Sequence, residues 1–115
     1  MAVYSFTRQE NVRVLRVSGP LEQPDAQTFK AELERATTAA GAMPIIVDLS
    51  RLEKIGSAAM RLLAQFTKRM AERGQAMITV GMSGVVREVV EMCGMDTLLK
   101  IAPTTDEALA DLSRA

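Results

Sequence analysis

The sequence predicts an α/β fold with a mixed β-sheet and elements in the order β-β-α-β-α-β-α-β-α. Two short β-rich runs separated by a polar turn open the chain, which is typical of a hairpin. Apolar stripes with helical spacing then alternate with short apolar runs, which is typical of parallel strands joined by right-handed crossovers. The chain has 115 residues, enough for one core, and we expect a single domain over residues 1–115.

The first three elements follow from composition and spacing. Residues 3–7 and 12–17 are rich in β-branched and aromatic residues and flank the turn RQEN. The next segment predicts a helix with Pro24 in its first turn and Gly41 at its end. Its apolar residues fall three or four apart and form one stripe: Ala26, Phe29, Leu33, Ala36 and Ala40.

A central strand and the most regular helix come next. The run IIVDL after Pro44 is almost continuously apolar, which indicates a strand covered on both faces. A charged loop should follow, and then a helix from Ser57 to Arg73 that stops at Gly74. The periodicity of this helix places Leu63 in the core and Arg61 on the polar side.

The last four elements repeat the alternation. QAMITVG predicts a strand, and SGVVREVVEMCG predicts a helix whose paired valines face inward. Cys93 lies on that apolar face, so we expect a small buried hydrophobic residue rather than a nucleophile. LLKIA predicts a short strand, and Thr104 with Glu107 forms a capping box that opens the final helix.

Composition excludes several classes of function. The 14 basic and 14 acidic residues cancel without any run of like charge, so no nucleic-acid partner is expected. No apolar stretch approaches the roughly 20 residues of a membrane span, and the start of the chain does not resemble a signal peptide. We therefore expect a soluble, cytoplasmic protein with no membrane insertion. Histidine is absent and there is one cysteine, which leaves little support for an enzyme, a metal site or a bound cofactor.

Ser57 is the main candidate for a functional residue, and two interpretations remain open. Its hydroxyl could cap the helix that it opens, as serine often does. Alternatively, Ser57 is the site of a phosphorylation switch. A helix N-terminus accommodates phosphate, and the added charge would prevent a partner from packing on the apolar residues Ala58, Ala59 and Met60.

The methionines and two carboxylates near this edge are also candidates. Met60 should be at least partly accessible, whereas Met82, Met92 and Met95 could be core residues or an adaptable apolar surface. Asp48 lies at the end of the predicted central strand, and Glu22 lies before the first predicted helix. Loop capping accounts for these two carboxylates better than paired acid–base chemistry does.

The chain resembles the STAS family, the bacterial anti-sigma factor antagonists and their relatives. The resemblance rests on GPLE at 19–22, IIVDLSRLEKIGSAAMRLL at 45–63 and the segment from 81 to 112. It implies a STAS fold with Ser57 at the position of the phosphorylated serine. It also implies a kinase-like anti-sigma factor as partner, which binds the unphosphorylated domain and releases it after phosphorylating the serine with ATP. The nucleotide then belongs to the partner.

The sequence departs from the family pattern around the serine. Gly56 replaces an acidic or hydroxyl residue, Ala58 a second hydroxyl residue and Ala59 a glycine, while Glu22 stands where many relatives have aspartate. The resemblance therefore leaves open a non-switching adaptor in an ATPase, transport or stress-signalling complex. In either role, the expected partner-binding edge comprises Glu22, Gly56, Ser57, Ala58, Ala59, Met60, Arg61, Met82 and Ser83.

Overall fold

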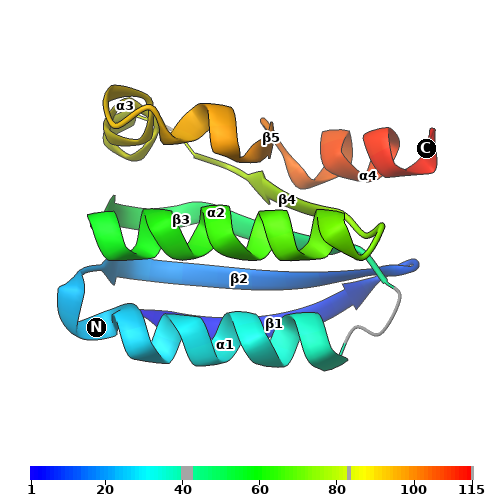
Figure 1. Ribbon diagram of the computed structural model, residues 1–115, viewed down its shortest axis with the longest axis horizontal. Coiled ribbons are helices and arrows are strands. Elements are labelled where there is room, and N and C mark those ends of the chain that lie inside the picture. Colours follow the sequence, from blue (N-terminus) through cyan, green and yellow to red (C-terminus); the bar gives the residue numbers. More distant parts are fainter. Residues whose placement is uncertain (40–42, 83, 115) are drawn as a thin grey trace.

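The computed structural model describes residues 1–39, 43–82 and 84–114, and it confirms the predicted order of strands and α-helices (Figure 1). Two short 3₁₀ helices, η1 and η2, were not expected. The elements are β1 Val3–Gln9, β2 Val12–Leu21, η1 Gln23–Asp25, α1 Ala26–Ala39, β3 Ile45–Ile55, α2 Ser57–Glu72, β4 Met77–Val80, α3 Gly84–Met92, η2 Met95–Leu98, β5 Lys100–Ala102 and α4 Thr105–Ser113.

The described strands form one five-stranded sheet in the order β1-β2-β3-β4-β5. β1 pairs with β2 in the antiparallel sense, and the other neighbours are parallel, so the predicted mixed sheet is confirmed. The main core cluster joins one face of the sheet to α1, α2 and α3, and a smaller cluster joins the opposite face to α4. Val47 belongs to the first cluster and Ile46 to the second, so β3 is covered on both faces as expected.

β3 is longer than predicted. The segment expected to be a charged loop continues the strand to Ile55, because Leu52 and Ile55 are buried and the backbone pairs with an extended β2. Two register shifts interrupt this pairing, one between Arg16 and Ser18 and one between Gly19 and Pro20. β4 stops opposite Asp48. Among the described strands, the far end of β3 therefore pairs only with β2, and we call residues 18–21 with 51–55 the β2–β3 ribbon.

The region after β4 departs from the predictions in two places. Cys93 is exposed, because α3 ends at Met92 and the chain turns at Gly94 with φ of 70°, so the expectation of a buried cysteine is wrong. The valines also divide: Val86 and Val90 are buried, whereas Val85 is 62% exposed. The Thr104 half of the predicted capping box is confirmed, because the Thr104 hydroxyl accepts the Glu107 N–H at 3.1 Å. The expected helix end at Gly41, with Ala40 before it, lies outside the described residues.

Gly81 connects β4 to α3 by passing very close to β3. Its φ is +81°, and a Cβ atom placed there would lie 2.8 Å from the Ser50 Cβ atom. Glycine fits both the left-handed backbone and the close approach. The residue thereby fixes the path of the chain from the sheet to α3.

Candidate functional site

The ends of β2 and β3 meet where the candidate site was expected. Leu21 pairs with Ile55, and the Gly56 N–H donates to the Leu21 carbonyl oxygen at 2.7 Å. A Cβ atom at Gly56 would lie 3.8 Å from the Glu22 Cα atom, so the two residues are neighbours in space. The structure therefore brings Glu22 beside the start of α2, where Ser57 is exposed to solvent.

Ser57 is the first residue of α2 and not its N-cap. Gly56 occupies the N-cap position with extended backbone, φ −92° and ψ 168°, and its carbonyl oxygen accepts the Met60 N–H at 3.1 Å. The interpretation of Ser57 as a capping side chain is therefore wrong, because the helix begins one residue earlier than it would if Ser57 were its N-cap. Ser57 instead lies at N1, where unpaired backbone N–H groups give the helix end a partial positive charge.

The residues after Ser57 turn into the core. Ala59 is 2% and Met60 3% exposed, so the expectation of a partly accessible Met60 is wrong. One helical turn brings Met60 onto the same side of α2 as Leu63, which packs in the main core cluster. Ala58 is half-buried and Arg61 is exposed. The accessible surface at the start of α2 is thus formed by Ser57, Ala58 and Arg61.

Lys54 also belongs to this site, although no sequence motif points to it. Its Nζ atom lies 2.9 Å from Glu22 Oε1, and both side chains are about half exposed. The hydrogen bond to Glu22, followed by the negative charge of that carboxylate, raises the pKa of Lys54. The contact exists because Lys54 lies on the β2–β3 ribbon, opposite Pro20, a strand segment that composition alone predicted to be a loop.

Met82, which was also expected at the partner-binding edge, lies apart from the end of β3. Met82 follows β4, which stops opposite Asp48, and it is half-buried against the main core cluster. Ser83 lies outside the described residues. α3 nevertheless begins at the same end of the molecule as α2 (Figure 1). The tight part of the site therefore consists of Glu22, Lys54, Gly56 and Ser57.

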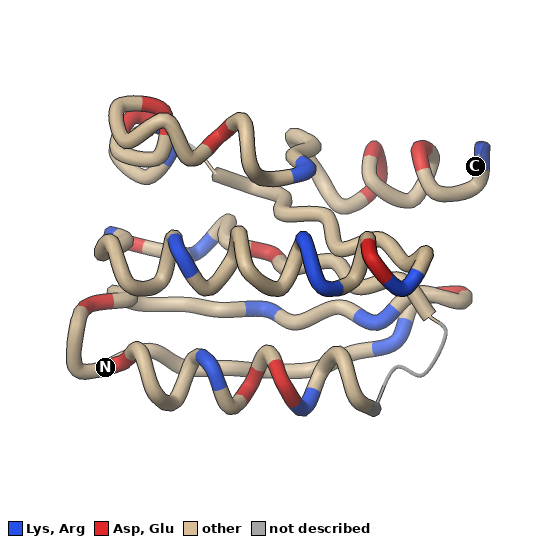
Figure 2. The backbone as a smooth tube through the Cα atoms, viewed as in Figure 1, with Lys and Arg blue, Asp and Glu red and all other residues tan. Residues whose placement is uncertain are grey.

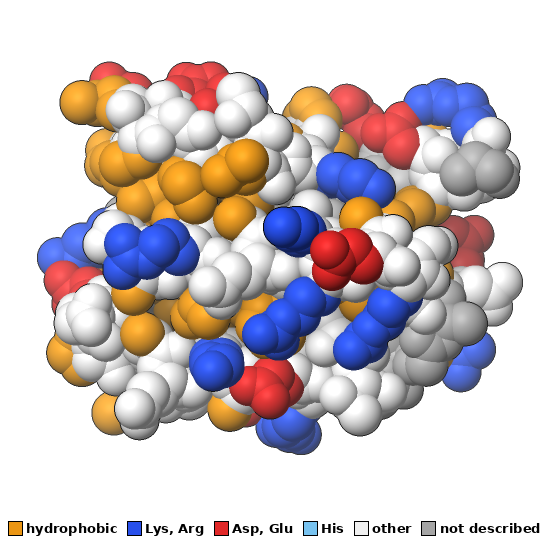
Figure 3. Space-filling view, in the orientation of Figure 1, with side chains coloured by type: hydrophobic (Ala, Val, Ile, Leu, Met, Phe, Trp, Pro, Cys, Tyr) orange, Lys and Arg blue, Asp and Glu red, His pale blue; other side chains and the backbone are white. Residues whose placement is uncertain are grey.

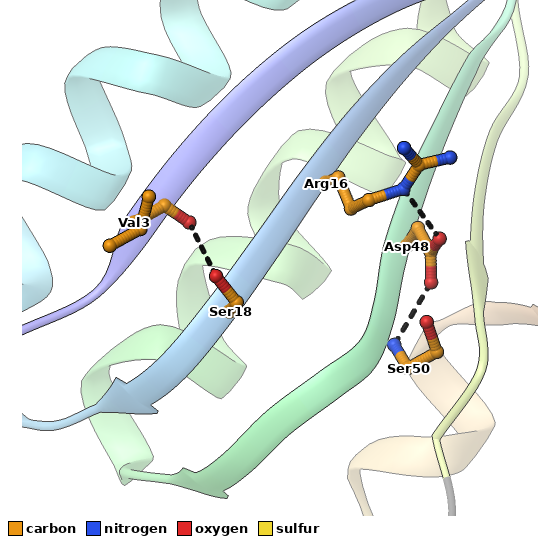
Figure 4. Close-up of polar contacts among 5 residues, drawn as sticks. All are labelled: Val3, Arg16, Ser18, Asp48 and Ser50. Atoms are coloured by element: carbon orange, nitrogen blue, oxygen red, sulfur yellow. Dashed lines mark hydrogen bonds and ion pairs between the residues drawn. The ribbon is translucent and has the colours of Figure 1, made fainter.

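Asp48 forms a separate polar contact on the side of the sheet opposite α1 and α2. Its Oδ2 atom accepts from Arg16 Nε at 3.1 Å and its Oδ1 atom from the Ser50 N–H at 2.9 Å, as Figure 4 shows. Figure 4 also shows the Ser18 hydroxyl donating to the Val3 carbonyl oxygen, which ties β2 to β1. The expected local capping by Asp48 is confirmed, whereas the Glu22 side chain pairs with Lys54.

Replacing Asp48 by asparagine should make the free energy of unfolding vary less with pH in the acidic range. Burial raises the pKa of Asp48, but the hydrogen bonds from Ser50 and the Arg16 guanidinium outweigh it, so the folded pKa is lowered. Such a carboxylate stabilises the fold above its unfolded pKa, about 3.9, and loses that contribution as pH falls through the folded value. Urea unfolding should show an Asn variant less stable than the wild type near neutral pH, with the difference shrinking below about pH 4. A difference independent of pH would contradict this role.

Charges elsewhere do not gather into a region of one sign. Figure 2 shows acidic and basic residues interspersed along most of the described chain. Among the described residues, no group of three or more acidic, cysteine or histidine side chains is placed to hold a metal ion. In the same described segments, no helix combines the length and apolar character needed to cross a bilayer.

Comparison with known proteins identifies relatives over almost the whole chain. The family model described as STAS domain matches residues 4–108. The anti-sigma-F factor antagonist RsfA of Mycobacterium tuberculosis is 26% identical over 107 residues, which are 92% of this chain and 84% of that protein. The crystal structure of an anti-sigma factor antagonist from Mycobacterium paratuberculosis superposes with a TM-score of 0.84 at 22% identity, over 96% and 93% of the two chains.

A structure of the Bacillus cell fate determinant SpoIIAA in its phosphorylated form is also similar. Its TM-score is 0.68 at 19% identity, and the match covers 96% of this chain and 99% of that one. At these identities the structural matches show the fold, and the family model spans both the β2–β3 ribbon and the start of α2. The chain belongs to the STAS domain family.

Proposed function

We propose that this chain is an anti-sigma factor antagonist that binds a kinase-type anti-sigma factor and is released when Ser57 is phosphorylated. It acts as a binding protein and not as an enzyme. The observation that carries the proposal is the exposure of Ser57 at the first position of α2, where it caps nothing and is open to a kinase. The names of RsfA and of the M. paratuberculosis protein support an antagonist role, and the phosphorylated SpoIIAA structure supports a switch.

A phosphate on Ser57 would change the surface more than the fold. The helix N-terminus stabilises an anion through its unpaired N–H groups. Phosphorylation adds about 1.5 to 2 negative charges, which must lose their hydration if the partner contacts this surface. The nearest side chains are the small, half-buried Ala58 and the buried Ala59, which provide a shallow apolar contact. A modification tolerated by the domain would therefore be incompatible with the complex.

The other residues of the site have distinct roles in this proposal. Glu22 and Lys54 present a fixed pair of charges beside the serine, and Arg61 adds a positive charge one turn along α2. Gly56 leaves the approach to Ser57 open. Ala59 and Met60 shape the surface from beneath, because both are buried. Met82 belongs to the neighbouring surface around α3.

The test is phosphate transfer to Ser57. The purified chain is incubated with the kinase-type anti-sigma factor of its source organism and ATP, and phosphopeptides are identified by mass spectrometry. Phosphate on Ser57 is expected, and Ser57→Ala should abolish it, while Ser5→Ala, at an exposed serine on β1, should not. A stable complex that neither ATP nor prolonged incubation dissolves, with Ser57 unmodified, would instead identify a non-switching adaptor.

A further inference from the structure

α3 has two apolar faces, and only one of them is buried. Val86 and Val90 pack into the main core cluster. Val85, Val89 and Met92 are spaced at i, i+4 and i+7, so they form a second stripe along the helix. Val85 is 62% and Met92 84% exposed, and Val89 is half-buried. Within the described chain, this second stripe has the spacing of a helix-packing surface but is left largely open to solvent.

η2 extends this stripe into a larger apolar surface. Leu98 is 57% exposed, and Met95 and Met82 are half-buried beside it. Figure 3 shows hydrophobic side chains gathered over α3 and η2 above α2. We call this region the α3–η2 surface; it comprises Met82, Val85, Val89, Met92, Met95 and Leu98. Three methionines make it deformable, which suits contact with a protein partner.

The charges that border the α3–η2 surface differ between its two sides. Figure 3 shows mostly basic side chains along α2 on one side and acidic side chains above α3 on the other. On the α2 side, Arg61 and Lys68 are exposed. On α3, Glu88 is exposed, and Glu91 pairs with Arg87 at 3.0 Å. A segment that fits this arrangement has an apolar face with acidic residues along the flank that lies over α2.

The position of the surface connects it to the proposed site. η2 contacts α2, and α3 lies at the end of the molecule where α2 begins (Figure 1). Three exposed apolar side chains supply only a small part of the roughly 800 Å² that each partner buries in a stable complex. The surface is therefore too small to hold a second copy of this chain by itself, but it can enlarge an interface centred on Ser57.

We propose that the α3–η2 surface binds an amphipathic helix of the anti-sigma factor, with the acidic flank of that helix over Arg61 and Lys68. This inference rests on the proposed function, because it assigns a second contact to the same partner. The apolar stripe supplies affinity, and the charged borders orient the bound helix.

Substitutions that place a charge on the surface test this inference. Met92→Asp and Leu98→Asp alter exposed side chains, so both variants should remain folded by circular dichroism. Calorimetric titration with the kinase-type anti-sigma factor in ADP should show Kd raised by about tenfold or more for each, since a buried unpaired charge disrupts an interface. Ala110→Asp is the matched control, because it adds the same charge to an exposed position on α4, against the opposite face of the sheet. That variant should bind like wild type.

The possible outcomes distinguish this inference from the proposed function. If the wild type is bound and phosphorylated on Ser57, and Met92→Asp and Leu98→Asp bind as tightly as the wild type, the α3–η2 surface is not used. Only this inference then fails. If the wild type is neither bound nor phosphorylated, the proposed function fails and the inference with it. Light scattering that shows a wild-type dimer and a Met92→Asp monomer would assign the surface to self-association and overturn the inference.

Discussion

Replacing Leu63 by alanine is expected to lower the free energy of unfolding by about 2–5 kcal/mol. Leu63 is fully buried in the main core cluster, where α2 packs on the sheet together with Phe66 and Met70. Truncation removes the transfer free energy of the leucine side chain and leaves a cavity that the strands beneath cannot close. Urea unfolding followed by circular dichroism measures the change, with a shifted midpoint and a similar slope as the expected result.

Arg61→Ala is the matched control on the same helix. Arg61 is exposed, so its loss should change the free energy of unfolding by no more than about 0.5 kcal/mol. A tolerant Leu63 combined with a strongly destabilising Arg61 substitution would show that the wrong face of α2 had been assigned to the core.

Ser57→Asp is expected to fold at least as stably as the wild type and to bind the anti-sigma factor far more weakly. A carboxylate at N1 interacts favourably with the helix N-terminus, by about 0.3–1 kcal/mol. In the complex the same charge must be desolvated against Ala58 and the partner. Thermal unfolding measures the first effect, and calorimetric titration in the presence of ADP measures the second.

Ser57→Ala separates the charge from the loss of the hydroxyl. Because Gly56 occupies the N-cap position, this substitution removes no capping side chain and should cost little stability. The alanine variant should bind like wild type and stay bound when ATP replaces ADP. An aspartate variant with wild-type affinity would exclude phosphorylation of Ser57 as the release mechanism.

The fold was predictable because its signals are local. The apolar run before Asp48 and the stripe that includes Leu63 each indicate one type of element, and both elements occur, although β3 continues to Ile55. The Thr104 cap is equally local, since it depends on two residues three positions apart. The position of Ser57 beyond the end of β3 was predictable from these elements. Strands that alternate with helices run parallel, so their carboxyl ends lie at the same edge of the sheet.

The details that failed depend on contacts between distant parts of the chain. Lys54 was assigned to a loop because its segment is charged, and only pairing with β2 makes that segment a strand and brings Lys54 to Glu22. The exposure of Cys93 depends on where α3 ends, which periodicity fixes poorly. Met60 looked accessible because it lies near a helix end, but the fourth residue of α2 already faces the core.

The β2–β3 ribbon has a consequence for the motions of the site. Beyond Asp48 this part of β3 has one neighbouring strand among the described elements, so fewer backbone hydrogen bonds hold it than hold the strand centre. Segments with fewer such bonds open locally at a lower free energy than the core does. The backbone amides of residues 51–55 should therefore exchange with solvent deuterium before those of residues 45–48. Opening can reach Gly56 and Ser57 while the rest of the sheet stays intact, so the site can change shape without global unfolding.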